Sequence, residues 1–172
     1  MQLSNLIKNL GPVSKVRRNH ALEHATLQVL AEKKVSGNMA GLSDTRGFWV
    51  FGDVDSEDLV ANVEEARERL ISGEHTLAIH PHCGTNFAVA GIIGGFFAWL
   101  AMLGVQKNWK DRFDRLPNVI TFATLGLILA QPLGPKAQQM ITTEANIENL
   151  HPVEVLCFKE RTPPVHRVLT SG

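Results

Sequence analysis

The residues most able to carry out chemistry lie in the pentad His20-Ala21-Leu22-Glu23-His24. Side chains three and four positions apart share one face of an α-helix, so His20 and His24 can present two imidazoles to one metal ion with Glu23 beside them. This H-x-x-E-H order combines two zinc ligands with a glutamate that can act as general base. The alternative interpretation is a solvated helix face on which the three side chains fall together by chance.

A second cluster of ligand types lies in residues 80–86, which read HPHCGTN. If the two clusters meet, the third ligand would come from His80, His82 or Cys83, and an open fourth position would hold a reactive water. Alternate residues of a strand share a face, so His80 and His82 could both ligate, or one could support the other by a hydrogen bond. Four protein ligands with no open position would instead make the site structural.

Cys83 permits a different chemistry. A cysteine that precedes Gly84 and Thr85, at the start of a helix and beside imidazoles, is in a setting that lowers the pKa of a thiol. It could act as a nucleophile with His80 or His82 as its base. That interpretation leaves the pentad without a role. The segment around Thr85 also suits the turn and N-cap of the helix that follows.

Glutamates further along the chain are alternative ligands. Enzymes with the H-x-x-E-H order usually take a downstream glutamate as third ligand, and Glu144, Glu148 and Glu154 are candidates here. Each of them suits a solvated helix position or a cap equally well. We therefore expect Glu144 and Glu154, together with His82 and Thr85, to be alternative ligands or to support the ligands by hydrogen bonds.

The elements that must position these residues form a small α+β unit, expected over residues 1–86. Apolar residues at helical spacing predict a helix at about 15–33, which carries the pentad near its middle. A turn sequence followed by a bulky β-prone run predicts a hairpin over 39–54. A second helix over 55–71 and a short strand at 76–79, which leads into the second cluster, complete the order helix, hairpin, helix, strand.

Two long apolar runs follow the second cluster. Residues 87–105 and 117–135 each contain nineteen residues without a charge, the length that crosses the hydrocarbon core of a bilayer. We expect a two-helix transmembrane hairpin over 87–135, and the alternative is a helical hairpin buried in a soluble core. Gly91 and Gly95 form a G-x-x-x-G face, which predicts self-association between helices.

The charge balance restricts the class of partner. Lysine plus arginine equal aspartate plus glutamate at 17 each, which excludes a strongly basic nucleic-acid-binding protein and leaves the lipid bilayer as the expected partner. The loop between the apolar runs carries the interface-type Trp109 and four basic residues, Lys107, Lys110, Arg112 and Arg115. The positive-inside rule would place this loop in the cytoplasm, but the N-terminal domain would then be exported without an apolar signal segment. The expectation leans towards a cytoplasmic N-terminal domain.

Taken in order, the motifs resemble those of the YqhQ-like membrane proteins, which are bacterial proteins of unknown function. Their pattern is H-G-A-E-H-K, H-P-R-C-G-T-S-F, an apolar stretch, Q-x-L-T-T and a final E-V-A. The present chain has HALEHAT at 20–26, HPHCGTN at 80–86, an apolar hairpin, QMITT at 139–143 and EV at 154–155. The resemblance covers about residues 19–156, and it implies a divergent relative with membrane association and no established activity.

The resemblance also implies that one shared polar site is built from the positions that match the family motif. These are His20, Glu23, His24, His80, Cys83, Gly84 and Thr85. The chain departs from the motif at Ala21 and Leu22, which replace the glycine–alanine pair, and at His82, which replaces an arginine. His82 is therefore not carried over from the family.

We predict an α+β fold with three parts, a soluble domain over 1–86 that holds the site, a transmembrane helical hairpin over 87–135, and a polar C-terminal segment over 136–172. The predicted function is a membrane-anchored metal-binding protein, a zinc-dependent hydrolase or peptidase-like enzyme. The alternative is a non-catalytic membrane protein with a structural metal or a polar His/Cys cluster. The predicted ligands for zinc or another divalent transition metal are His20, His24, His80 and Cys83, with Glu23 as the catalytic base.

Overall fold

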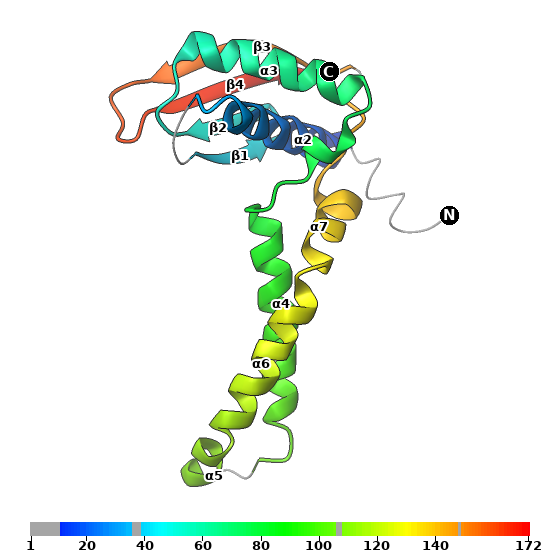
Figure 1. Ribbon diagram of the computed structural model, residues 1–172, viewed down its shortest axis with the longest axis vertical. Coiled ribbons are helices and arrows are strands. Elements are labelled where there is room, and N and C mark those ends of the chain that lie inside the picture. The colour runs from blue at the N-terminus through cyan, green and yellow to red at the C-terminus, as the bar shows by residue number, and fades with distance from the viewer. Residues whose placement is uncertain (1–10, 36–38, 106–107, 148) are drawn as a thin grey trace. The chain divides into compact units, whose positions relative to one another are not determined.

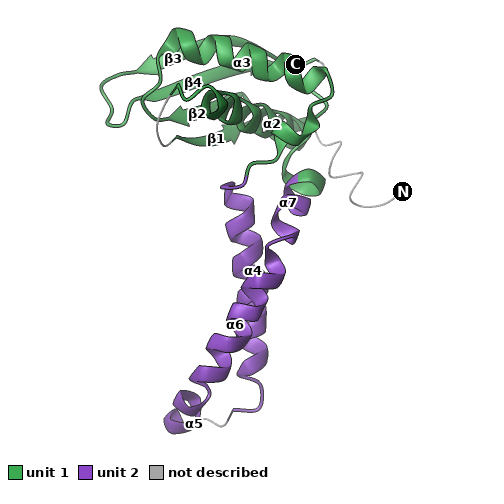
Figure 2. Cartoon of the chain, viewed as in Figure 1, with its two compact units in different colours: residues 1–80, 139–172 green, residues 81–138 purple. Residues whose placement is uncertain are grey.

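The computed structural model describes residues 11–35, 39–105, 108–147 and 149–172. The chain divides into two compact units (Figure 2). Unit 1 contains residues 1–80 and 139–172, and unit 2 contains residues 81–138. Unit 1 is therefore assembled from both ends of the chain, and unit 2 is inserted between them in the sequence.

Unit 1 is a four-stranded antiparallel sheet with helices packed on one face (Figure 1). The strands lie in the order β1-β2-β4-β3, so β4 is a central strand between β2 and β3. The elements of this unit in chain order are α2 (Gly11–Glu32), β1 (Ala40–Asp44), β2 (Gly47–Phe51), α3 (Ser56–Ile71), the 3-10 helix η1 (His75–Ala78), the π-helical turn η2 (Gln138–Thr142), β3 (His151–Phe158) and β4 (Val165–Ser171).

Local chemistry explains how the hairpin and α3 begin. The carboxylate of Asp44 accepts a hydrogen bond from the backbone N–H of Arg46 at 2.7 Å and closes the turn between β1 and β2. Gly47 has a φ of 143°, a conformation that side-chain-bearing residues rarely adopt. Asp55 caps α3 by accepting a hydrogen bond from the N–H of Glu57 at 2.8 Å. The predicted hairpin and both predicted helices of the N-terminal half are confirmed.

The hydrophobic core of unit 1 lies between the sheet and the two helices. Alternate residues of a strand share a face, and Phe48 and Val168 are register partners that are both fully buried. They belong to one core cluster with Leu22 and Leu30 of α2 and with Leu59 of α3. This packing holds α2 rigidly, which matters because α2 carries the pentad.

The structure differs from the predicted α+β arrangement in two places. The strand predicted over residues 76–79 is wrong, because residues 75–78 form the 3-10 helix η1 and no described strand pairs with them. The polar C-terminal segment expected over 136–172 supplies β3 and β4, which complete the sheet of unit 1. Val168 pairs with Phe48 on β2 and with Val155 on β3, so burial by distant segments makes this stretch a strand.

Unit 2 is built around two helices that pack against each other, α4 (Gly84–Ala101) and α6 (Leu116–Ala130) (Figure 2). The short α5 (Trp109–Asp114) precedes α6, and α7 (Leu133–Ala137) follows it. A Cβ added to Gly126 of α6 would lie 3.0 Å from the Cα of Gly94 on α4, so the two helices meet closely at these glycines.

The two-helix transmembrane hairpin expected over 87–135 is not confirmed. In the described part of the chain, α4 is the one helix that is long and apolar enough to cross a membrane. The second apolar run breaks at residues 131–132, and α6 with the helical segment Leu133–Thr142 qualifies only as a pair bent by 52°. Pro132 and Pro135 lack the N–H that a continuous helix needs, which explains the break.

Candidate metal centre

Helix α2 places His20 and His24 one turn apart, with their ring centroids 4.2 Å from each other. Ala21, Leu22 and Ala25 on the same helix are fully buried, so the core fixes the rotation of α2 about its axis. His24 is 2% exposed, and His20 is partly exposed at the edge of the core. The predicted pairing of the two imidazoles on one helix face is confirmed.

A backbone carbonyl orients each of these imidazoles. Nδ1 of His20 lies 3.0 Å from the carbonyl oxygen of Thr142, and Nδ1 of His24 lies 2.8 Å from that of Ala78. A carbonyl only accepts, so in each neutral ring Nδ1 carries the proton and the lone pair is on Nε2. Histidines that bind metals usually have this arrangement, since the hydrogen bond at one nitrogen fixes the ring and makes the other a better ligand.

His80 brings a third imidazole to the pair. Its ring centroid lies 5.5 Å from that of His24, with 37° between the ring planes. Among the described residues, however, the group that could share a metal ion contains His20, His24 and Cys83 and not His80. The segment before His80 is tied to α2, because Nε2 of Gln28 donates hydrogen bonds to the carbonyls of Leu77 at 2.7 Å and Ile79 at 3.1 Å. Unit 1 therefore gathers all three predicted histidine ligands, two from α2 and one from the end of the η1 segment.

Glu23 lies beside the histidines in a tightly enclosed position. It is 4% exposed, and its carboxylate accepts a hydrogen bond from Oγ of Ser43 on β1. Burial raises the pKa of this carboxyl group, while the hydrogen bond from Ser43 and the nearby charge of His20 act in the opposite direction. A Cβ at Gly41 would lie 2.1 Å from Oε1 of Glu23, so β1 leaves room for the carboxylate only because residue 41 is glycine.

Cys83 and its neighbours follow His80 and begin helix α4. Cys83 is the N-cap of α4, and its Sγ accepts a hydrogen bond from the backbone N–H of Thr85 at 3.4 Å. The segment therefore does cap the helix, as expected, although the capping residue is the cysteine. His82 is exposed. By donor type, His20, His24 and Cys83 make a group that could hold a metal ion, since imidazole nitrogen and thiolate sulfur both suit zinc.

Of the downstream glutamates, Glu148 lies outside the described residues, and Glu144 and Glu154 have surroundings of their own. Glu144 forms an ion pair with the buried Arg17 of α2, with 3.2 Å between Oε2 and Nη1. Glu154 is exposed on β3, where it pairs in register with Leu169. In the described residues, no group of potential ligands that could share an ion includes either glutamate.

Sequence reasoning missed the groups that support the candidate ligands. The carbonyls of Ala78 and Thr142 carry no signal in the sequence, because every residue has one. Ser43 and Gly41 are small strand residues with no chemistry of their own. Thr142 alone had an indirect signal, since it belongs to the QMITT stretch at 139–143 that entered the motif resemblance.

Comparison with known proteins gives the family. Residues 15–155, which include α2 and both clusters, match the family described as a domain of unknown function, DUF6391. The chain belongs to the DUF6391 family. The candidate site therefore lies within the part of the chain that matches DUF6391. The resemblance to the YqhQ-like proteins is not confirmed by this comparison.

One relative of this DUF6391 chain is an uncharacterised protein of Picosynechococcus sp. (strain ATCC 27264 / PCC 7002 / PR-6). The two are 41% identical over 142 residues, which is 74% of the present chain. The chain spans 65% of the length of that relative. No solved structure gives a significant match.

Proposed function

We propose that this DUF6391 chain is a membrane-anchored metal-binding protein in which His20 and His24 hold a zinc ion or another divalent transition metal. The observation that supports the proposal is the pair of hydrogen bonds from Nδ1 to the carbonyls of Thr142 and Ala78. Histidines on a solvated helix face would hydrogen-bond to water, and nothing would hold both rings in the tautomer that leaves Nε2 available to a ligand. His24 is moreover buried, where an unused imidazole would be costly to keep.

The ligand set is completed in the proposal by His80 and Cys83. The ring of His80 is already next to His24. Cys83 follows His80 by three residues, a stretch of chain that spans at most about 10 Å, so the thiol is tethered near these imidazoles. Nitrogen and sulfur ligands together favour zinc over magnesium or calcium, which prefer oxygen.

Membrane anchoring is the second half of the proposal. Helix α4 contains no charged residue, and large apolar side chains on it are exposed, with Phe87 70% and Ile92 72% exposed. An exposed apolar surface of this kind is unfavourable in water and favourable in lipid. We propose α4 as one span and the bent α6–α7 pair as the second, with the N-terminal domain on the cytoplasmic side.

A hydrolase is the proposed activity. A bound metal ion would supply Lewis acidity and lower the pKa of a water molecule. Glu23, next to His24 in the sequence, would accept the proton of that water during attack on a carbonyl carbon. The competing candidate is a structural site, and the hydrogen bond from Ser43 to Glu23 favours it because that bond occupies the carboxylate. The number of protein ligands distinguishes the two candidates.

Metal analysis of the purified full-length protein tests the site. We expect about one zinc ion per chain in the wild type, a loss of most of it in His24→Ala, and full retention in Glu23→Gln, because the glutamate is not a ligand. His75→Ala is the matched control, since His75 is an exposed histidine of unit 1. Metal-free wild type, purified without chelator, or a His24→Ala protein that is folded by circular dichroism and fully loaded, would contradict the site.

Cobalt substitution then counts the ligands. Four-coordinate cobalt with a thiolate ligand shows a sulfur-to-metal charge-transfer band, which should disappear in Cys83→Ser if the thiol is a ligand. Exchangeable water on the cobalt, detected by displacement with azide, would support the hydrolase. A cobalt site without exchangeable water would exclude the hydrolase and leave the structural site.

A further inference from the structure

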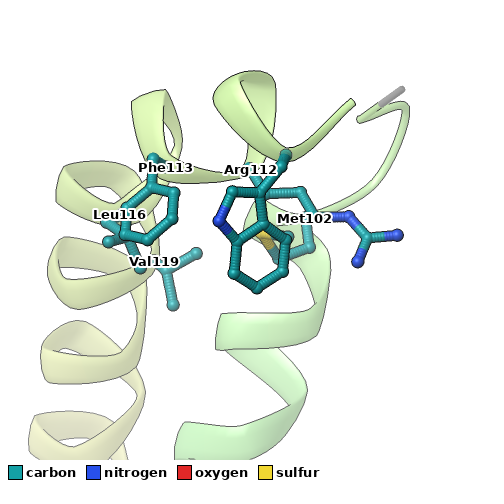
Figure 3. A pocket seen from close by; sticks show the side chains of 6 residues that line it. Met102, Arg112, Phe113, Leu116 and Val119 are labelled. Atoms are coloured by element: carbon teal, nitrogen blue, oxygen red, sulfur yellow. The ribbon is translucent and has the colours of Figure 1, made fainter. Parts of the chain in front are cut away.

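One pocket of unit 2 lies where α5 meets the ends of α4 and α6 (Figure 3). Its volume is about 310 Å³, at the lower end of the range of small-molecule sites. The pocket is lined by Met102, Trp109, Arg112, Phe113, Leu116 and Val119. The one charged residue in this lining is Arg112, and the surface of the pocket itself is apolar, so Arg112 lines it with its alkyl stem.

The aromatic residues at this pocket are exposed in a way that suits a bilayer interface. Trp109 and Phe113 are 68% and 54% exposed, and their ring centroids are 5.4 Å apart in an edge-to-face arrangement. Tryptophan is enriched at the level of lipid headgroups, where its ring lies among acyl chains and its N–H remains wet. Trp109, which lines the pocket, is therefore of the residue type that is enriched at the level of the lipid headgroups.

The segment that supplies part of this lining also carries three basic residues. Lys110, Arg112 and Arg115 lie on or next to α5. Within the described part of the chain, none of these three has a carboxylate partner within 4.0 Å, although Asp111 and Asp114 are near them in the sequence. Figure 3 shows the guanidinium group of Arg112 extending away from the other lining side chains. A guanidinium carried by a lining residue of an apolar pocket can pair with an anion that is attached to an apolar group in the pocket.

We propose that this pocket binds one acyl chain of an anionic phospholipid and that Arg112 pairs with the net negative charge of its headgroup, which a zwitterionic lipid lacks. The inference rests on the membrane anchoring proposed above. An apolar lining alone would accept any lipid, and a free arginine alone would accept any phosphate. The combination of the two in one pocket selects a molecule that carries an acyl chain and a negative headgroup.

Tryptophan quenching by brominated lipids tests the pocket in the full-length protein reconstituted into vesicles. Trp49→Phe and Trp99→Phe leave Trp109 as the single fluorophore. We expect brominated phosphatidylglycerol to half-quench Trp109 at a mole fraction about fivefold lower than brominated phosphatidylcholine does, as one basic contact with an anionic headgroup allows. In Arg112→Gln the two lipids should become equivalent. Lys110→Gln, which removes an α5 cation outside the pocket lining, should retain the preference.

The outcomes separate this proposal from membrane anchoring. Equal quenching by the two lipids in the wild type, with the protein resistant to carbonate extraction, would overturn the lipid pocket and leave the anchor. A preference that survives in Arg112→Gln would also overturn it. Quenching by neither lipid, together with release by carbonate, would overturn both. Competition by inorganic phosphate at the concentration of the anionic lipid would show that the site recognises phosphate without an acyl chain, which contradicts the proposal.

Discussion

At the scale of single residues, the environment of Glu23 is the most restrictive feature of the candidate site. A buried carboxylate is unfavourable unless hydrogen bonds compensate, and here the donor is Ser43 on the facing strand. Gly41 on the same strand provides the space for the carboxylate. The raised pKa of Glu23 follows from its burial. Loss of the hydrogen bond from Ser43 would destabilise the fold whether Glu23 acts as a base or as a structural acceptor, so a stability measurement tests this arrangement for either role.

We predict that Gly41→Ala destabilises unit 1 by about 1–3 kcal/mol, because the new Cβ displaces the Glu23 carboxylate and breaks its hydrogen bond to Ser43. The measurement is urea unfolding of the full-length protein in detergent, followed by Trp49 fluorescence. Gly11→Ala is the control, since a Cβ at Gly11 meets no atom of the described residues within 4 Å. Equal unfolding midpoints for Gly41→Ala and the wild type would mean that the carboxylate moves without cost.

Part of the candidate site can be predicted from the residue types and their spacing, and the rest depends on contacts that only the tertiary fold creates. His20 and His24 are predictable because helix periodicity alone puts them on one face. The carbonyls of Ala78 and Thr142, which select the tautomer of the two rings, are not predictable from residue type. Thr142 in particular lies 122 positions from His20 in the sequence, and only the tertiary fold brings it to the imidazole.

At the scale of elements, the glycines of the apolar helices divide into two groups. Gly94 and Gly126 lie at the contact between α4 and α6. Gly91 and Gly95, the G-x-x-x-G pair singled out by spacing, have no atom within 4 Å of an added Cβ. Spacing identified a small-residue face, but sequence alone could not show that the adjacent Gly94 is the one used within the chain. Self-association through Gly91 and Gly95 stays a prediction.

We predict that Gly126→Ala weakens the α4–α6 contact by about 1–3 kcal/mol, because the nearest atoms to its Cβ include backbone atoms of Ile93 and Gly94 at 3.0 Å, which cannot turn aside. Thermal unfolding in detergent, followed by helical circular dichroism, measures the effect. Gly91→Ala and Gly95→Ala are matched controls within helix α4 and should be neutral or slightly stabilising, since alanine is the better helix former. A Gly126→Ala protein as stable as these controls would contradict the close contact.

The strands of the C-terminal region show why element prediction succeeded for one half of unit 1 and failed for the other. The hairpin of β1 and β2 is local, and its turn and bulky residues are adjacent in the sequence. Strand β4 pairs with β2 across more than a hundred residues, so no local turn signals the pairing. Strand β3 is largely exposed, which removes the alternation of apolar and polar residues that would have identified it.

At the scale of the whole molecule, unit 1 depends on segments from both ends of the chain. Oγ1 of Thr170 on β4 donates a hydrogen bond to Oδ1 of Asn19 on α2 at 2.7 Å, and Nη2 of Arg17 donates one to the carbonyl of Thr143 at 2.7 Å. Both contacts are next to the pentad in the sequence. The candidate ligands of α2 are therefore positioned by residues that come after unit 2, and the site forms only when the two halves of unit 1 have folded together.

The central strand of this assembled unit also contains a titratable group that should make its stability depend on pH. His166 on β4 is 1% exposed, and neither ring nitrogen has a hydrogen-bond partner among the residues that the structure describes. Its register neighbours are Val50 and Cys157. Burial lowers the pKa of His166 below its usual 6.5, Asp55 acts to raise it, and Lys159 lowers it further. The folded state therefore favours the neutral ring.

We predict that unit 1 loses stability as the pH falls below 6.5 towards the lowered pKa of folded His166, because the unfolded state binds the proton more readily than the folded state. Above pH 6.5 the ring is neutral in both states, and His166 contributes no pH dependence. Urea midpoints at pH 8 and pH 5.5 measure the effect. His166→Leu, which removes the buried nitrogens at similar volume, should lose less stability over this interval than the wild type, whereas His75→Gln should match the wild type, because His75 is exposed. Identical pH dependence in the wild type and His166→Leu would show that the fold accommodates the charged ring, for example by opening a path to Asp55.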